Sequence, residues 1–147
     1  MSKSEVAQAA SVLLADSYTL YLKTHNYHWN VTGPMFTTLH TLFETQYTDL
    51  ALAVDEIAER IRAVGEYAPG SYAAFGKLSS VQEATDVPKA VAMIETLVAD
   101  QAIIVKSAQA LIATAEAAGD QASADLGVRR IEVHEKNAWM LRSHLEG

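Results

Sequence analysis

Residues 25–65 read HNYHWNVTGPMFTTLHTLFETQYTDLALAVDEIAERIRAVG, and this stretch decides the fold. Gly33 and Pro34 divide it, because glycine stops a helix and proline fits the first turn of the next one. After this break, apolar side chains recur at three-to-four spacing until Gly65, as on one face of a long helix. We therefore predict a helix hairpin that turns at Gly33-Pro34. The apolar positions of its second helix are Phe36, Leu39, Phe43, Tyr47, Leu50, Val54, Ile57, Ile61 and Val64.

The flanking sequence extends the hairpin to four helices. Apolar spacing predicts the first helix over residues 4–31, and residues 66–87 are typical of a long crossover, with a short helix around residues 72–75. Pro88 opens a third helix that stops at Gly119, and Asp120 is a suitable N-cap for a fourth, ending near Leu145. The sequence thus predicts one all-α domain over residues 1–147, a ferritin-like four-helix bundle with a long crossover between helices 2 and 3.

Composition restricts the class of protein. The 147 residues include no cysteine, which excludes disulfides and thiolate metal sites, and the formal net charge of −7 disfavours a general nucleic-acid binder. The opening MSKSEVAQAA lacks the apolar core of a secretory signal, and the sequence has no run of about 18 apolar residues that could span a membrane. We expect a cytoplasmic protein that binds cations.

Two pairs of metal-ligand residue types lie on the second helix. His40 and Glu44 are four residues apart, as are Asp55 and Glu59, so each pair occupies one helix face. The eleven residues from Glu44 to Asp55 are close to three whole turns, which places both pairs on one stripe but roughly 16 Å apart along the axis. One metal site therefore cannot use all four residues of a single helix.

A second copy of the chain solves this spacing problem. The stripe is turned about 100° from the core-facing positions, and Thr48 and Ala51 between the pairs are small. Antiparallel pairing about a two-fold axis would bring each His40–Glu44 pair to the partner's acidic pair, twice per dimer. His28 lies as far before Pro34 as His40 lies after it, so it joins the same site. The predicted ligands are His28, His40 and Glu44 of one copy with Asp55 and Glu59 of the other.

Imidazole and carboxylate ligands without thiolate suit iron, with manganese and zinc as alternative ions. A site inside one bundle, as in classical ferritins, uses Glu-x-x-His pairs, and none of the five histidines follows a glutamate at that spacing. Other interpretations are that the histidines fill polar gaps in a hairpin and that Asp55 and Glu59 pair with Arg60 or Arg62. We expect His134 and His144 to serve structure or lie exposed, and His25, three residues before His28, to cap or pack, with a further metal ligand as the alternative.

The segment resembles the signature region of the Dps family, the miniferritins also called DNA-binding proteins from starved cells. The matching elements are His28-Trp29-Asn30, Gly33, Phe36, Leu39-His40, Asp55 and Ala58-Glu59-Arg60. The resemblance implies a hollow shell of twelve subunits in a bacterium or archaeon, with a di-iron ferroxidase centre at each dimer interface. It implies oxidation of Fe(II), by hydrogen peroxide in preference to dioxygen, storage of ferric mineral, and protection against oxidative damage. Trp29 would lie beside the centre and donate an electron. The family commonly has aspartate where this chain has Glu44, whose side chain reaches one methylene further, so we still expect it to ligate the metal.

Two further expectations concern the surface. Acidic residues line the three-fold pores through which iron passes in the family, which makes Asp120 and Asp125 candidate pore residues; the alternative for Asp120 is helix capping. Twelve copies would carry about 12 × −7 = −84 charges, and the N-terminal segment offers only Lys3, so direct DNA binding should be weak or absent. A non-enzymatic DNA-compacting protein and a structural oligomer without a working site are the competing functions.

Overall fold

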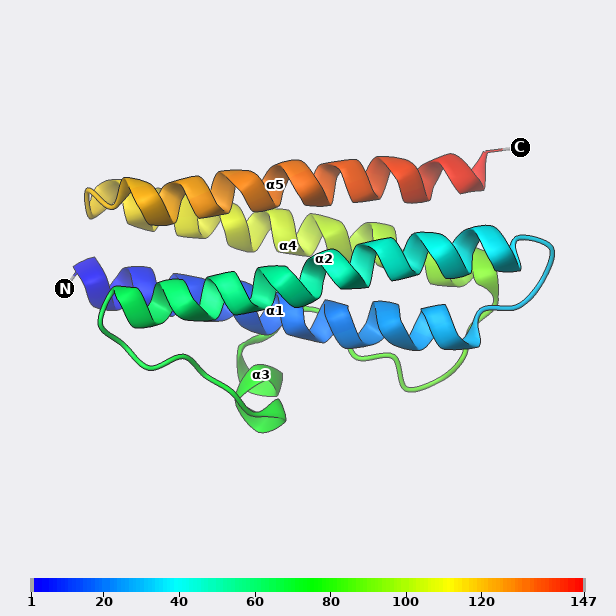
Figure 1. Cartoon of the computed structure of the whole chain (residues 1–147), viewed down its shortest axis with the longest axis horizontal. Helices are drawn as coiled ribbons and strands as arrows, with labels where there is room; N and C mark the ends of the chain where they lie inside the picture. Colours follow the sequence, from blue (N-terminus) through cyan, green and yellow to red (C-terminus); the bar gives the residue numbers. More distant parts are fainter. Residues whose placement is uncertain (1, 147) are drawn as a thin grey trace.

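The computed structural model describes residues 2–146, and over that range it consists of helices and connections without strands. Four long helices lie side by side along the long axis of the molecule (Figure 1). They are α1 (Ser2–Asn30), α2 (Phe36–Ala63), α4 (Ala90–Ala117) and α5 (Gln121–Arg142). The short α3 (Tyr72–Leu78) interrupts the long connection from α2 to α4 and lies beside α1, and a 3-10 turn, η1 (Ser143–Leu145), follows α5. The predicted all-α bundle with a long crossover is confirmed.

Several helix boundaries differ from the prediction by a few residues, since α1 spans Ser2–Asn30 and not residues 4–31, and α3 extends to Leu78. Helix α4 begins at Ala90 and not at Pro88, because Lys89 has the extended dihedral angles of an N-cap (φ −71°, ψ 161°). Helix α5 ends at Arg142, and only the tighter 3-10 turn reaches Leu145. The predicted cap of α5 is confirmed, since the Asp120 carboxylate accepts a hydrogen bond from the Ser123 amide at 3.0 Å.

Glycines with positive φ lie in the turns that follow the first two long helices. Gly33 has φ 106° and Gly65 has φ 102°, values in the left-handed region that a side chain disfavours. At Gly33 the reversal brings the start of α2 back alongside the end of α1. The hairpin predicted from Gly33-Pro34 therefore forms, and it places residues on either side of the turn close together.

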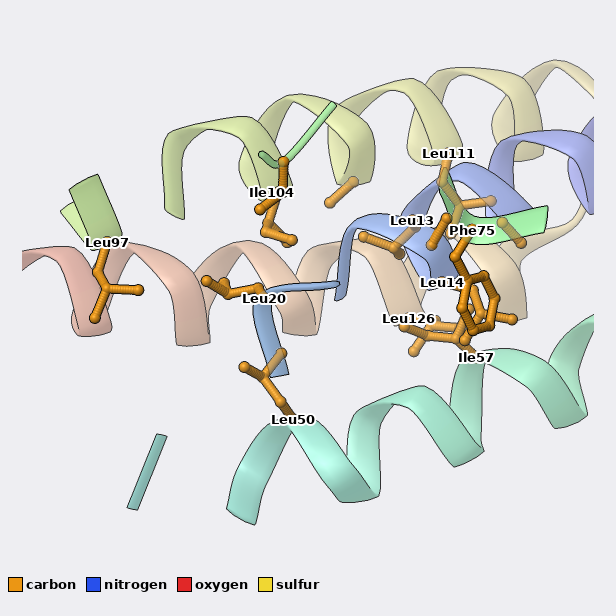
Figure 2. Close-up of a cluster of buried hydrophobic side chains, with 14 of the residues drawn as sticks. Leu13, Leu14, Leu20, Leu50, Ile57, Phe75, Leu97, Ile104, Leu111 and Leu126 are labelled. Atoms are coloured by element: carbon orange, nitrogen blue, oxygen red, sulfur yellow. The ribbon is translucent and has the colours of Figure 1, made fainter. Parts of the chain in front are cut away.

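The core lies between the apolar faces of the four long helices (Figure 2). Phe75 of α3 is also buried, at 7% exposure, so this part of the crossover packs against the bundle. Not every predicted apolar position is in the core, because Phe36 at the start of α2 is 42% exposed. The labelled core residues are Leu13, Leu14 and Leu20 of α1, Leu50 and Ile57 of α2, Phe75 of α3, Leu97, Ile104 and Leu111 of α4, and Leu126 of α5.

A buried carboxylate on α1 fixes the crossover. Asp16 is fully buried and accepts hydrogen bonds from the Ser79 hydroxyl at 2.9 Å and the Ser80 amide at 2.6 Å. It also accepts a hydrogen bond from the hydroxyl of Ser107 on α4. A buried carboxylate needs such donors, because burial without them costs several kcal/mol. The segment after α3 is thus held against both α1 and α4.

None of the helices between residues 2 and 146 combines the length and apolar character needed to cross a membrane.

Candidate metal centre

Two histidines meet where the hairpin closes. His28 lies in the last turn of α1 and His40 in the second turn of α2, and their rings stack with centroids 3.8 Å apart and planes inclined by 15°. The six-residue spacing of each histidine from Pro34 predicted that they would lie at one level. His28 is buried and His40 is half-buried, so both rings are held by their surroundings.

The two histidines also bind each other's main chain. Nδ1 of His28 lies 2.7 Å from the carbonyl oxygen of His40, and Nδ1 of His40 lies 2.7 Å from the carbonyl oxygen of His28. A carbonyl only accepts, so each Nδ1 carries the proton and donates it. In the neutral rings both Nε2 atoms then keep a free lone pair, which is the form in which histidine ligates a metal.

Glu44 completes a cluster with these histidines. One ligand atom from each of His28, His40 and Glu44 lies within 4.8 Å of the other two, close enough for small rotations to bring them around one ion. Glu44 is exposed, one turn after His40 on α2, and its longer side chain still reaches the histidines. Within residues 2–146 this is the one group of three or more such side chains at that distance. Hard carboxylate and imidazole ligands together suit iron or another divalent transition metal.

Asp55 and Glu59 lie elsewhere on α2. Both are exposed, and they line a groove shared with Asp125 and Arg129 of α5. Arg60 and Arg62 do not pair with these two carboxylates. Arg60 binds Asp120 at 3.0 Å, and Arg62 donates a hydrogen bond to the carbonyl oxygen of Glu66 at 3.1 Å. The side chains of Asp55 and Glu59 thus lie on the surface of the single chain.

Aromatic rings surround the cluster, and one of them, Tyr47, was predicted only as an apolar position of its helix. The His25 ring lies between Trp29, at 4.0 Å, and Tyr47, at 4.1 Å, and the Tyr47 ring lies 5.1 Å from that of His28. Trp29 is 57% exposed. Burial, and then the neighbouring His28, lower the pKa of His25. Tyr47 follows Glu44 by three residues, and this spacing was the available signal that it borders the cluster.

The candidate pore residues have different surroundings. Asp120 caps α5 and pairs with Arg60; burial opposes the charged carboxylate, but hydrogen bonds from Ser123 and the guanidinium of Arg60 lower its pKa on balance. Asp125 is exposed and accepts a hydrogen bond from Gln121 at 2.7 Å. The capping role of Asp120 is therefore present, and a pore role for either residue stays a prediction.

The remaining histidines serve structure. His134 is fully buried, with Nδ1 2.7 Å from Oε1 of Gln101 and Nε2 3.0 Å from the guanidinium of Arg130. His144 bonds the carbonyl oxygen of Met140 at 2.9 Å, near the end of α5.

Comparison with known proteins gives consistent matches along most of the chain. Residues 8–147 match the family model of the ferritin-like domain. A low temperature-induced protein of Nostoc is 43% identical over 136 residues, which cover 91% of this chain and 76% of that protein. A DNA protection during starvation protein of Brevibacillus brevis is 38% identical, with 98% of this chain and 99% of that protein covered. The crystal structure of a Dps protein of Vibrio cholerae, described as a ferritin-like diiron-carboxylate protein, superposes with a TM-score of 0.94 at 32% identity, covering 99% of this chain and 91% of that one.

Proposed function

The chain belongs to the Dps family of ferritin-like proteins, and we propose that it oxidises Fe(II) at a centre shared by two copies and stores the ferric product. The observation that carries this proposal is the cluster of His28, His40 and Glu44, in which both histidines keep Nε2 free. The hydrogen bonds from each Nδ1 to a main-chain carbonyl orient the rings before any metal arrives, which lowers the cost of binding.

We propose that a second copy supplies the remaining ligands. The cluster offers one carboxylate, whereas two iron ions need more oxygen ligands, and carboxylates favour the ferric product over the ferrous reactant. Asp55 and Glu59 stand on the same stripe of α2, roughly 16 Å farther along the helix. An antiparallel pair of α2 helices brings the acidic pair of one copy to the histidines of the other, so one two-fold axis generates two centres.

The reaction that fits this centre takes one electron from each of two Fe(II) ions. Two Fe(II), one hydrogen peroxide and two protons give two Fe(III) and two waters, so the peroxide accepts both electrons without releasing hydroxyl radical. Dioxygen is the alternative oxidant. Iron is here the substrate; we favour it over zinc and manganese because the Vibrio cholerae relative is described as a diiron-carboxylate protein. We propose that Trp29 donates an electron at the centre, and the contact of its ring with that of His25 supports this role.

The proposed assembly is a hollow dodecamer that protects against oxidative damage by sequestering iron. Twelve copies of the 15.9 kDa chain give a particle of about 190 kDa with a charge near −84. Asp120 and Asp125 remain candidates for its pores. This charge repels phosphate, so we propose that protection does not require tight DNA binding.

The test is iron oxidation by purified protein. Fe(II) is added anaerobically, hydrogen peroxide or air follows, and ferric absorbance is recorded for wild type, for the double variant His28→Ala/His40→Ala, and for Glu44→Ala. Glu56→Ala is the matched control, because Glu56 is an exposed α2 glutamate that pairs with Arg129 at 3.3 Å outside the cluster. We expect fast oxidation to a soluble ferric product in wild type and control, and loss in the other two. Rates equal to the protein-free rate in all four would reject the proposal.

A further inference from the structure

A line of tyrosines leads away from the metal cluster. It begins at Tyr47 of α2, whose ring lies 5.1 Å from that of His28, and continues to Tyr21 of α1 at 6.1 Å. Tyr21 lies 5.7 Å from Tyr18, and Tyr18 lies 6.4 Å from Tyr72 of α3. All these centroid distances fall within the range of aromatic contact, about 4.5–7 Å. Four redox-active side chains from three helices thus form one continuous path.

The two ends of the path have different surroundings. Tyr47 and Tyr21 are half-buried beside the cluster, whereas Tyr72 is 72% exposed. Tyr18 and Tyr72 line a groove together with Asp55. In the dimer of the proposed function, Asp55 is a ligand of the partner's iron. The path therefore starts at one centre of a dimer and ends in the groove beside the other.

On the basis of the proposed function, we propose that Tyr47, Tyr21, Tyr18 and Tyr72 carry an oxidising equivalent from a half-filled centre to this groove. A centre with one Fe(II) supplies one electron, but hydrogen peroxide needs two to become water. The balance is one Fe(II), one tyrosine, one peroxide and one proton giving one Fe(III), one tyrosine phenoxyl radical and two waters. The tyrosine loses an electron and its phenolic proton. Transfer along the path moves the radical to Tyr72, whose proton passes to solvent.

The radical at Tyr72 has a reductant nearby. Fe(II) at the partner's centre gives up one electron, and Tyr72 regains its proton from water, so the two centres of a dimer together reduce one peroxide. This arrangement prevents one-electron cleavage of peroxide to hydroxyl radical when iron is scarce. Phenylalanine at these positions could not be oxidised in this way, so the path depends on the phenolic groups of the four tyrosines.

The test is a radical assay on the assembled protein. Less than one Fe(II) per chain is loaded anaerobically, excess hydrogen peroxide is added, and samples are frozen for electron paramagnetic resonance. Protein grown with ring-deuterated tyrosine distinguishes a tyrosyl signal, which narrows, from a tryptophanyl signal, which does not. We expect a tyrosyl radical whose yield falls several-fold as iron loading rises to two per centre.

Tyrosine-to-phenylalanine variants test which tyrosines belong to the path. Tyr47→Phe should lower the tyrosyl yield several-fold, and Tyr18→Phe should retain a radical but abolish oxidative modification of Tyr72 in peptide mass spectra. Tyr67→Phe is the matched control, since this 86% exposed tyrosine packs against Arg62 and lies outside the path. Normal iron oxidation with no tyrosyl signal, or with a signal on Trp29 alone, would overturn the inference and leave the proposed function standing. Absence of iron oxidation above the protein-free rate would reject both.

Discussion

His28 and His40 bind each other's main chain reciprocally, with each Nδ1 2.7 Å from the other residue's carbonyl oxygen. The carbonyl of His28 belongs to the last turn of α1, where helix carbonyls lack an intrahelical partner. The ring of His40 therefore also closes the end of α1. One pair of side chains joins the two helices of the hairpin and leaves both Nε2 atoms for a metal.

Removing His40 should destabilise the protein even without iron. In His40→Ala the carbonyl of His28 loses its donor, and an unsatisfied buried acceptor costs about 1–3 kcal/mol. Glu44→Ala should leave the stability of the metal-free protein nearly unchanged, because Glu44 is exposed. Urea unfolding of both variants after chelation checks this, and equal midpoints for the two would show that the bond from the His40 ring to the carbonyl oxygen of His28 contributes nothing measurable.

A mixing experiment should reveal whether the centre is shared. The variants His28→Ala/His40→Ala and Asp55→Asn/Glu59→Gln should each lose iron oxidation. Co-expressed, they form mixed dimers in which one centre combines the intact histidines of one copy with the intact carboxylates of the other. Random pairing should restore about one quarter of wild-type activity, since half of the dimers are mixed and half of their centres are intact. Mixtures as inactive as the parents would place the complete site within one chain.

The hairpin and its histidines could be predicted because the signals were local and strong. Gly33-Pro34 marked the turn, and equal spacing around it placed His28 and His40 at one level. The reciprocal hydrogen bonds could not be predicted, because they depend on ring orientation and on the distance between two packed helices. The same limit applies to the N-terminus of α4, where the dihedral angles of Lys89 decide the boundary.

The hydrogen-bond partners of buried polar groups also could not be predicted from the sequence. Asp16 lies among apolar positions of α1, and nothing local indicates that Ser79, Ser80 and Ser107 will donate to it. These partners come from segments more than sixty residues away. Helix periodicity identifies which face is buried, but the donors that satisfy a carboxylate on that face are set by the crossover.

The buried ion pair between Lys23 and Asp100 should be costly to break. Nζ lies 2.8 Å from the carboxylate, the side chains are 4% and 6% exposed, and Nζ also donates to the carbonyl oxygen of Gln82 at 2.9 Å. Burial raises the pKa of Asp100, and Lys23 opposes that rise. Lys23→Met should lower stability by about 3–5 kcal/mol, because it leaves a buried carboxylate unpaired. Adding Asp100→Leu should recover much of the loss in urea unfolding; a double variant no more stable than the single one would contradict this explanation.

Gly127 should not tolerate alanine, although it lies within a helix. A Cβ atom there would lie 2.7 Å from Cγ1 of Ile112 and 3.0 Å from the carbonyl oxygen of Ala108, both on α4. Alanine gains about 1 kcal/mol in helix propensity, but overpacking costs about 1–3 kcal/mol, and the backbone contact leaves little room to relax. We expect a net loss, measured as a lower thermal midpoint. Gly76→Ala, in the open surroundings of α3, is the control and should not lower it.

The neutral ring of His134 should make stability fall in mild acid. Burial, and then the guanidinium of Arg130, lower its pKa to about 3, below the value of about 6.5 in an unfolded chain. In mild acid the unfolded state therefore binds a proton at His134, and the folded state does not. The stability from the neutral ring is fully present above about pH 6.5 and is lost as pH falls toward 3, by about 1.4 kcal/mol per unit. Between pH 7 and pH 5 this amounts to about 2 kcal/mol.

Glutamine can replace both hydrogen bonds without titrating, so His134→Gln should show a smaller loss over that interval, whereas His144→Gln should follow the wild type. Equal losses in wild type and His134→Gln, measured by urea unfolding at the two pH values, would assign the acid sensitivity to other groups.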